Sequence, residues 1–220
     1  MKEIRTIVYD CDGVMFDSTA ANLVFYQRVM AEMGREPFDE DDEEVIRIIH
    51  SHASRDVLTW LFPDPEQFGR ALDAARRIDY RELVPLMVME EGYRDTLDRL
   101  AGSFDLAVCT NRSSSVEAVL DAFGIRQYFS LVVTAARVPN PKPHPDPLYA
   151  VMDHYRCGPE QILFIGDSMV DYHAATAARV PFVGYRNSFP HTPRIDHHLQ
   201  LIDFLGVNGA PLPVNREVMA

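Results

Sequence analysis

The chain has 220 residues, of which 47% are hydrophobic and 25% are charged, and its formal net charge is -12. This length is sufficient for one sizeable hydrophobic core, with or without a smaller inserted lobe, and the composition is that of an ordinary globular protein. The excess of negative charge excludes broad binding to nucleic acid or to anionic membrane surfaces, because their phosphate groups would be repelled.

The apolar segments and the cysteines of the sequence indicate the cellular compartment. No apolar run approaches the length of a membrane span, and the residues after Met1 lack the basic and apolar segments of a signal peptide. Cys11, Cys109 and Cys157 have no metal-ligand spacing, and unpaired thiols suit a reducing compartment. We therefore expect a cytoplasmic protein that binds neither membrane nor nucleic acid.

The first predicted element is a strand, Thr6–Tyr9, that opens directly onto two carboxylates, Asp10 and Asp12. Because side chains alternate along an extended chain, the two carboxylates would lie on one side and repel each other. A divalent cation would relieve that repulsion, and the pair would then suit a nucleophile, Asp10, beside an acid/base group, Asp12. The structural alternative is a plain Asp-Gly turn at Gly13. An EF-hand calcium loop fits poorly, because its glycine and glutamate spacing is absent.

A segment with helical patterning and no convincing strand follows. We expect it to form a separate helical lobe, over residues 17–84, inserted after the first strand. The stretch His50–Arg55 interrupts the helical pattern, and Pro63 and Pro65 break it again. The expected helices cover about 23–33, 45–49, 57–62 and 68–83.

From Val88 onward, predicted helices alternate with predicted strands. This alternation implies right-handed crossovers and a parallel sheet with helices on both faces, and so a Rossmann-like α/β fold. The α/β core is expected to comprise residues 1–16 and 85–220. The expected strands cover 104–109, 131–134, 162–165 and 182–183, and the expected helices cover 92–100, 116–123, 146–155 and a segment ending at 178.

Polar residues stand at the carboxyl ends of these strands, which is where ligands bind in open parallel sheets. Positions far apart in the sequence therefore converge at one edge of the sheet. The candidates that share this placement are Asp10, Asp12, Thr110, Asn111 and Asp167, with Lys142 in the loop after another strand.

Two of these residues would suit anion binding. Thr110 precedes a serine-rich helix start, where its hydroxyl, the backbone N–H groups and the helix dipole favour an oxyanion. Alternatively, Thr110 or Ser113 only caps that helix. Lys142 is held among four prolines, so its ammonium would be positioned to neutralise phosphoryl oxygens. Alternatively, it is a solvated lysine in an extended linker.

Asp167 and Asp171 lie four positions apart around a predicted helix start. They would complete a magnesium site or hold Lys142 in place. The alternative is an N-capping aspartate with a surface partner one turn later.

Four short motifs together strongly resemble the signature motifs of the haloacid dehalogenase-like hydrolase superfamily. The resemblance spans about residues 4–185, and the inserted helices are placed as in the phosphoglycolate phosphatase-like branch, which also includes pyrophosphatases and β-phosphoglucomutases. The motifs are Asp10-Cys11-Asp12-Gly13-Val14-Met15-Phe16-Asp17-Ser18, Thr110-Asn111, Lys142-Pro143, and Gly166-Asp167-Ser168 with Asp171.

The resemblance implies a role for each of the first two carboxylates. Asp10 would be phosphorylated during the reaction. Asp12 would protonate the leaving group and later activate water. Dehalogenases of the superfamily lack this second carboxylate, so the presence of Asp12 favours phosphoryl transfer.

The resemblance also implies a magnesium site and a phosphate site. Mg²⁺ would be held by the Asp10 side chain, the backbone carbonyl of Asp12 and the Asp167 side chain, with Asp171 in support. The residues implied to bind the phosphoryl group are Thr110, Asn111 and Lys142.

By the same resemblance, the helical lobe is a cap domain that selects the substrate. The stretch His50–Arg55 is similar to the family's substrate-specificity loop, except that it lacks the glycine common there. Arg55 would hold an anionic group of the substrate, or it is a surface charge at a helix start. The tail from Asn187 extends beyond the resemblance. We expect one packed helix there, through Leu199 and Leu205, and loosely attached final residues.

The preferred hypothesis is a Mg²⁺-dependent phosphatase of a small phosphorylated metabolite, phosphoglycolate or a related monoester, that works through an aspartyl-phosphate on Asp10. Two alternatives stay open. A phosphomutase of the β-phosphoglucomutase type would pass the phosphoryl group to a sugar hydroxyl rather than to water. A non-catalytic protein would use the same scaffold to bind a phosphorylated ligand without turnover.

Overall fold

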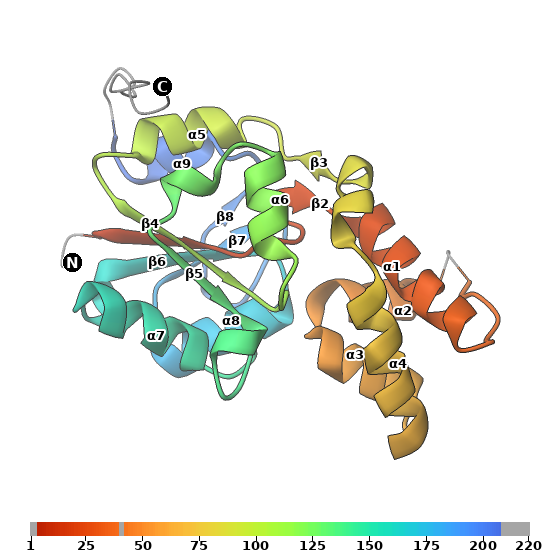
Figure 1. Ribbon diagram of the computed structural model, residues 1–220. Helices are drawn as coiled ribbons and strands as arrows, with labels where there is room; N and C mark the ends of the chain where they lie inside the picture. The colour runs from red at the N-terminus through yellow and green to blue at the C-terminus, as the bar shows by residue number, and fades with distance from the viewer. Residues whose placement is uncertain (1–3, 40–41, 208–220) are drawn as a thin grey trace.

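The centre of the molecule is a parallel sheet of six strands (Figure 1). The structure is a computed structural model that describes residues 4–39 and 42–207. Each neighbouring pair in the sheet runs parallel, and β1 lies between β4 and β6. In spatial order the strands are β5 (Leu131–Thr134), β4 (Asp105–Thr110), β1 (Thr6–Tyr9), β6 (Ile162–Gly166), β7 (Phe182–Tyr185) and β8 (Arg194–Ile195).

Helices cover both faces of this sheet, as the alternating pattern predicted. Side chains along β1 point alternately to the two faces, so Ile7 and Tyr9 belong to one hydrophobic cluster and Val8 to another. Among the helices that contribute to the first cluster are α5 (Tyr93–Leu100), α6 (Val116–Ala122) and α9 (Gln200–Phe204). Those that contribute to the second are α7 (Asp146–Tyr155) and α8 (Met169–Ala178).

Four further helices form a separate helical lobe at the right of Figure 1, beside the sheet. The lobe has its own hydrophobic cluster, which includes Tyr26, Val57 and Phe62. Two of its helices begin at aspartates whose side chains accept backbone N–H groups, Asp42 and Asp64. The helices are α1 (Thr19–Glu32), α2 (Glu43–Ser51), α3 (Ser54–Leu61) and α4 (Pro65–Arg77).

The two chain segments that join the lobe to the core pair with each other. β2 (Phe16–Asp17) and β3 (Val88–Met89) form a short antiparallel ribbon. The sequence did not predict this ribbon or β8, because strands of two residues have too short a pattern to detect. We propose that the ribbon marks the junction between the cap domain, expected over residues 17–84, and the core.

Two helix predictions in the lobe were wrong in extent. The helix expected over 68–83 ends at Arg77, and two short 3-10 turns follow, Tyr80–Glu82 and Val84–Leu86. The Asp79 side chain accepts the N–H of Arg81 and starts a new turn, so the α-helix does not continue. The stretch expected to interrupt the pattern from residue 50 instead continues α2 as far as Ser51.

None of the helices in the described part of the chain has both the length and the apolar character that a bilayer span requires. The packed helix expected in the tail is α9, which contributes Leu201 and Ile202 to the first cluster. The final residues, expected to be loosely attached, lie outside the described residues.

Candidate active site

A buried lysine stands between two aspartates at the carboxyl edge of the sheet. Asp10 follows β1 directly, and its backbone N–H donates to the carbonyl of Ile165 in β6 at 2.9 Å. The Lys142 Nζ lies 2.7 Å from Asp10 Oδ1, where it makes an ion pair without the angle of a hydrogen bond. The same Nζ donates to Asp171 Oδ1 at 2.6 Å and to the carbonyl of Cys109 at 3.0 Å. The lysine is 2% exposed, so the alternative of a solvated linker residue is wrong.

Two further aspartates from the end of β6 complete an acidic cluster. Carboxylate oxygens of Asp10, Asp167 and Asp171 all lie within 4.8 Å of one another. Asp171 occupies the first turn of α8, where its carboxylate accepts the N–H and the hydroxyl of the N-capping Ser168. The N-capping role is therefore taken by Ser168, and Asp171 is fully buried rather than paired on the surface.

Gly13 brings the turn after β1 against this cluster. Its φ of +75° lies in the left-handed region that favours glycine. A Cβ atom at this position would overlap Asp167 Oδ2. Close approach of the two strand-end loops therefore requires a residue without a side chain.

The cluster holds more negative charge than its single lysine balances. Burial, followed by the charge of Asp171, raises the pKa of Asp10 to about 7, although Lys142 opposes the shift. Burial and the neighbouring carboxylates raise the pKa of Asp167 well above its usual range. Burial alone would lower the pKa of Lys142, but Asp10 and Asp171 raise it and keep the side chain charged.

The donor set fits a hard divalent cation. Carboxylate oxygens are the ligands that Mg²⁺ prefers, and one such ion would offset the surplus negative charge of the cluster. Asp171 is already bonded to Lys142 and Ser168, which leaves Asp10 and Asp167 as the side chains best placed to hold the ion. The side chain of Asp12 turns away from the cluster toward another partner, so the expected contribution of Asp12 through its backbone carbonyl stays a prediction.

That partner is Arg112, which sequence analysis did not single out. Its Nε donates to Asp12 Oδ2 at 2.7 Å and its Nη2 to Asp12 Oδ1 at 2.5 Å, a two-pronged pair between residues that are 8% and 7% exposed. Ser18 and Asn22, at the start of α1, also donate to Asp12 Oδ1. Burial would raise the pKa of Asp12, but the Arg112 guanidinium outweighs it and lowers that pKa below its usual value.

The strand-end residues Thr110 and Asn111 both make local contacts. The Thr110 hydroxyl accepts the backbone N–H of Arg112 at 3.1 Å. Neither Thr110 nor Ser113 caps the next helix, because α6 begins at Val116 with Ser115 at its N-cap. The Asn111 amide donates to two backbone carbonyls, that of Lys142 at 3.0 Å and that of Ser51 in the lobe at 3.2 Å. The phosphate-binding role of Thr110 and Asn111 stays a prediction.

A cavity of about 540 Å³ lies between the lobe and the carboxyl edge of the sheet. Asp10 and Asp12 line it from the core, and the stretch from His50 to Arg55 lines it from the lobe. The guanidinium of Arg55 lies 5.1 Å from the ring centroid of Phe68. Its expected contact with the substrate stays a prediction, supported by its position in the cavity wall.

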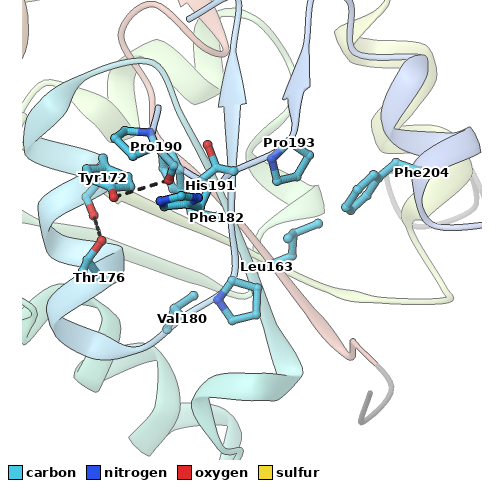
Figure 2. Close-up of a pocket in the computed structure, with 11 residues that line it drawn as sticks. Leu163, Tyr172, Thr176, Val180, Phe182, Pro190, His191, Pro193 and Phe204 are labelled. Carbon is cyan, nitrogen blue, oxygen red and sulfur yellow. Dashed lines mark hydrogen bonds between the residues drawn. The ribbon is translucent and has the colours of Figure 1, made fainter. Parts of the chain in front are cut away.

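A second cavity, of about 390 Å³, is lined by residues of β6, β7 and α8 and by the loop that follows β7 (Figure 2). Figure 2 shows apolar side chains on β7 and the following loop, such as Phe182 and Pro193, with Phe204 of α9 opposite. None of its lining residues is a carboxylate, a lysine or an arginine. It therefore lacks the groups that phosphoryl chemistry requires.

The structure thus brings together the predicted Asp10, Lys142, Asp167 and Asp171, although they come from three separate stretches of sequence. It places the Asp12 side chain beside them but in a different ion pair. Sequence reasoning missed the partners of that pair. The available signals were the position of Arg112 directly after Thr110-Asn111, and the spacing of four between Ser18 and Asn22, which places both on one helix face.

Known proteins resemble this chain over most of its length. A family model described as haloacid dehalogenase-like hydrolase matches residues 7–185. A phosphoglycolate phosphatase of Escherichia coli O157:H7 is 30% identical over 251 aligned positions, which cover 98% of this chain and 97% of that protein. One of Salmonella typhi is 31% identical over 213 positions, with 84% and 82% covered.

A solved structure is similar at a higher level of identity. The crystal structure of a haloacid dehalogenase-superfamily hydrolase, subfamily IA, variant 1, from Geobacter sulfurreducens is 54% identical, with a TM-score of 0.74. The match covers 92% of this chain and 97% of that one. The six-stranded parallel sheet and the carboxylate cluster at its carboxyl edge define a Rossmann-like α/β protein with a candidate metal site. The chain belongs to the haloacid dehalogenase-like hydrolase family, in its phosphoglycolate phosphatase-like branch, and is an enzyme of the phosphatase type.

Proposed function

We propose that this enzyme is a Mg²⁺-dependent phosphatase that hydrolyses a small phosphorylated metabolite through an aspartyl-phosphate on Asp10. The observation that carries the proposal is the ion pair between Lys142 Nζ and Asp10 Oδ1, at 2.7 Å, inside a buried acidic cluster. A buried carboxylate beside a fixed ammonium, at the wall of a cavity, is the arrangement that a phosphoryl acceptor needs.

In the first step, an oxygen of Asp10 attacks phosphorus and the bond from phosphorus to the ester oxygen breaks. Lys142 is placed to offset the charge on the transferred oxygens. The leaving oxygen takes a proton from Asp12, which also lines the cavity and whose pKa the negatively charged phosphoryl group raises on binding, against the effect of Arg112. In the second step, Asp12 takes a proton from water, the water oxygen bonds to phosphorus, and the acyl-phosphate bond breaks to restore Asp10 and release phosphate.

Asp10 and Asp167 would hold the magnesium ion, with Asp171 in support. When bound, the ion supplies positive charge against the phosphoryl oxygens and relieves the repulsion within the acidic cluster. Asp171 acts through Lys142, because its carboxylate accepts from the ammonium at 2.6 Å and fixes where that charge lies. Thr110 and Asn111 would bind the phosphoryl group from the end of β4.

The substrate that we propose is a phosphomonoester the size of phosphoglycolate or somewhat larger. Curated relatives named phosphoglycolate phosphatase, at 30% and 31% identity, support a substrate of this class. The cavity of about 540 Å³ has room for more than a phosphoryl group, and Arg55 would hold a second anionic group there. The buried free thiols of Cys11 and Cys109 support work in the reducing cytoplasm.

The test is the Asp10→Asn variant, assayed with 2-phosphoglycolate and with para-nitrophenyl phosphate in the presence of Mg²⁺. Turnover of both should fall by more than about 10⁴-fold, because an amide oxygen is a poor nucleophile. Asp203→Asn, an exposed aspartate on α9, is the matched control and should keep full activity. Retained turnover in D10N contradicts the mechanism.

The same assay separates the alternatives. Release of inorganic phosphate at the rate of substrate loss supports hydrolysis by water. A sugar phosphate that is isomerised faster than phosphate is released would replace the phosphatase with a phosphomutase. Magnesium binding without turnover of any ester would indicate a binding protein.

A further inference from the structure

The carboxylate of Asp12 accepts four hydrogen bonds from side chains, which is more than proton transfer by itself requires. Its Oδ1 accepts from Arg112 Nη2, from Ser18 and from Asn22, whereas its Oδ2 accepts from Arg112 Nε. A carboxylate oxygen offers two lone-pair sites. Among the described residues, Oδ2 is therefore the oxygen with a site left for the leaving group or the attacking water.

Arg112 has little capacity left for any other partner. Of its five N–H groups, Nε and one Nη2 hydrogen bond Asp12, the second Nη2 hydrogen bonds Asn22 Oδ1 at 3.0 Å, and Nη1 bonds Ser115 at 3.1 Å. Its side chain is 6% exposed. A guanidinium used in this way orients a carboxylate and is not free to bind a substrate anion.

The same arginine contacts the helical lobe. The Arg112 guanidinium lies 4.6 Å from the ring centroid of Tyr80, whose hydroxyl donates to Asn22 Oδ1 at 2.9 Å. The Asn22 amide in turn lies 3.4 Å from His50 Nδ1 at the end of α2. Asp12 of the core is thus tied to the lobe through one continuous polar network.

We propose that Arg112 is a positioning residue of this enzyme, which fixes the Asp12 carboxylate and sets its position relative to the helical lobe. The proposal rests on the proposed phosphatase function. Arg112 holds Oδ1 against α1 and presents Oδ2 toward the cavity. The position of the acid/base group then depends on how the lobe sits on the core, because Asn22 and Tyr80 belong to the lobe side of the network.

Arg112→Gln tests this placement. It removes the two-pronged contact, so kcat for 2-phosphoglycolate should fall about 10- to 100-fold while KM changes less than about threefold. Arg112→Lys keeps the charge but cannot span both carboxylate oxygens, and its kcat should lie between those of R112Q and wild type. R112K also decides the matter if R112Q does not fold. Tyr80→Phe loses only the hydroxyl contact with Asn22 and should lower kcat about two- to threefold.

A double-mutant cycle distinguishes positioning from general structural damage. If Arg112 acts through Asp12, then adding Arg112→Gln to Asp12→Ala should lower kcat no further than about twofold. Para-nitrophenyl phosphate is the substrate for this cycle, because its good leaving group needs less proton transfer and keeps residual rates measurable. Arg28→Gln removes another arginine–carboxylate pair, the exposed one with Glu82, and should leave both constants unchanged.

Three results would overturn the proposal. The first is wild-type kcat in folded R112Q or R112K. The second is a raised KM with unchanged kcat, which would make Arg112 a substrate-binding residue. The third is additive losses in the cycle with Asp12→Ala. If D10N remains active, the phosphatase mechanism itself fails, so the two failures are separable.

Discussion

Two buried ion-pair networks lie side by side at the carboxyl edge of the sheet, and they differ in charge and in what they join. The first comprises Asp10, Lys142 and Asp171, with Asp167 beside them, and its residues all belong to the α/β core. The second pairs Asp12 with Arg112 and extends into the helical lobe. One network has surplus negative charge, and the other is balanced.

The difference separates two tasks that one site must perform. The core network is fixed by strand ends and by the first turn of α8, and none of its four side chains comes from the lobe. In the proposed mechanism, the uncompensated charge of this network would hold the magnesium ion. In the second network the charges of Asp12 and Arg112 balance, so its proposed effect is to fix the position of the Asp12 carboxylate. In the proposed mechanism, acceptance of the phosphoryl group by Asp10 would thereby be separated from proton transfer by Asp12.

After removal of the proposed nucleophile itself in Asp10→Asn, the largest loss should come from removing the ammonium of Lys142 from the first network. Lys142→Met leaves buried carboxylates without their ammonium and removes charge stabilisation of the transferred phosphoryl group. Turnover should fall by about 10³-fold. The free energy of unfolding should fall by about 3 to 5 kcal/mol in urea titrations. Lys142→Arg keeps the charge and should lose less stability. A stable, active K142M would contradict this assignment.

The pH dependence should have opposite sign in the two networks. The pKa of Asp10 is raised to about 7 in the folded state, so its contribution to stability is full below its unfolded value and is lost as pH rises through 7. Metal-free protein should therefore lose stability between about pH 4 and pH 8, by an amount on the order of a few kcal/mol. Mg²⁺ should restore more stability at pH 8 than at pH 5.

Asp12 should behave in the opposite way. Its pKa is lowered by Arg112, so its contribution is present above its unfolded value and is lost as the solution is acidified through the folded pKa. Thermal unfolding of metal-free Asp10→Asn and Asp12→Asn, from pH 8 down to about pH 2, checks both signs. The Asp12 contribution is lost only below the ordinary carboxyl pKa of 3.8, so the loss of stability in that acid range should shrink in D12N. The pH 4 to 8 loss should shrink in D10N and persist in D12N. The reverse pattern would exchange the roles of the two networks.

Loss of the Arg112 charge should lower the stability of the protein as well as its activity. Arg112→Met leaves Asp12 buried without its partner and should lower the free energy of unfolding by about 3 kcal/mol. The matched Arg28→Met breaks a pair whose side chains are 43% and 63% exposed, and should cost less than about 1 kcal/mol. Equal losses in the two variants would mean that burial of the Asp12–Arg112 pair does not affect the free energy of unfolding.

The smallest effect should come from the helix cap that supports the first network. Ser168→Ala removes the N-cap of α8 and one donor to Asp171, and should cost about 1 kcal/mol in chemical unfolding. Turnover should fall only a fewfold, because the Lys142 contact with Asp171 remains. A loss as large as that of K142M would show that Ser168 has a more direct part in the site.

Much of the α/β core was predictable because its signals are local and long. The strand Thr6–Tyr9 is buried along its whole length, and helices separate β4, β5, β6 and β7 from one another along the chain. The ribbon of β2 and β3 was not predictable, since two residues carry no period. The end of α4 was missed because hydrophobic spacing continues to Leu83, whose side chain is buried in the core cluster from the junction of two 3-10 turns rather than from the helix.

The sequence by itself determined which residues stand at strand ends, because alternation of strands and helices forces a parallel sheet whose carboxyl ends share one edge. That rule predicts that one edge of the sheet brings together Asp10, Lys142 and Asp167. Only the tertiary structure decided that Asp12 pairs with Arg112, a residue 100 positions away. Such a pair depends on the rotamers and burial of two side chains and on the docking of a separate lobe, and no local pattern encodes these.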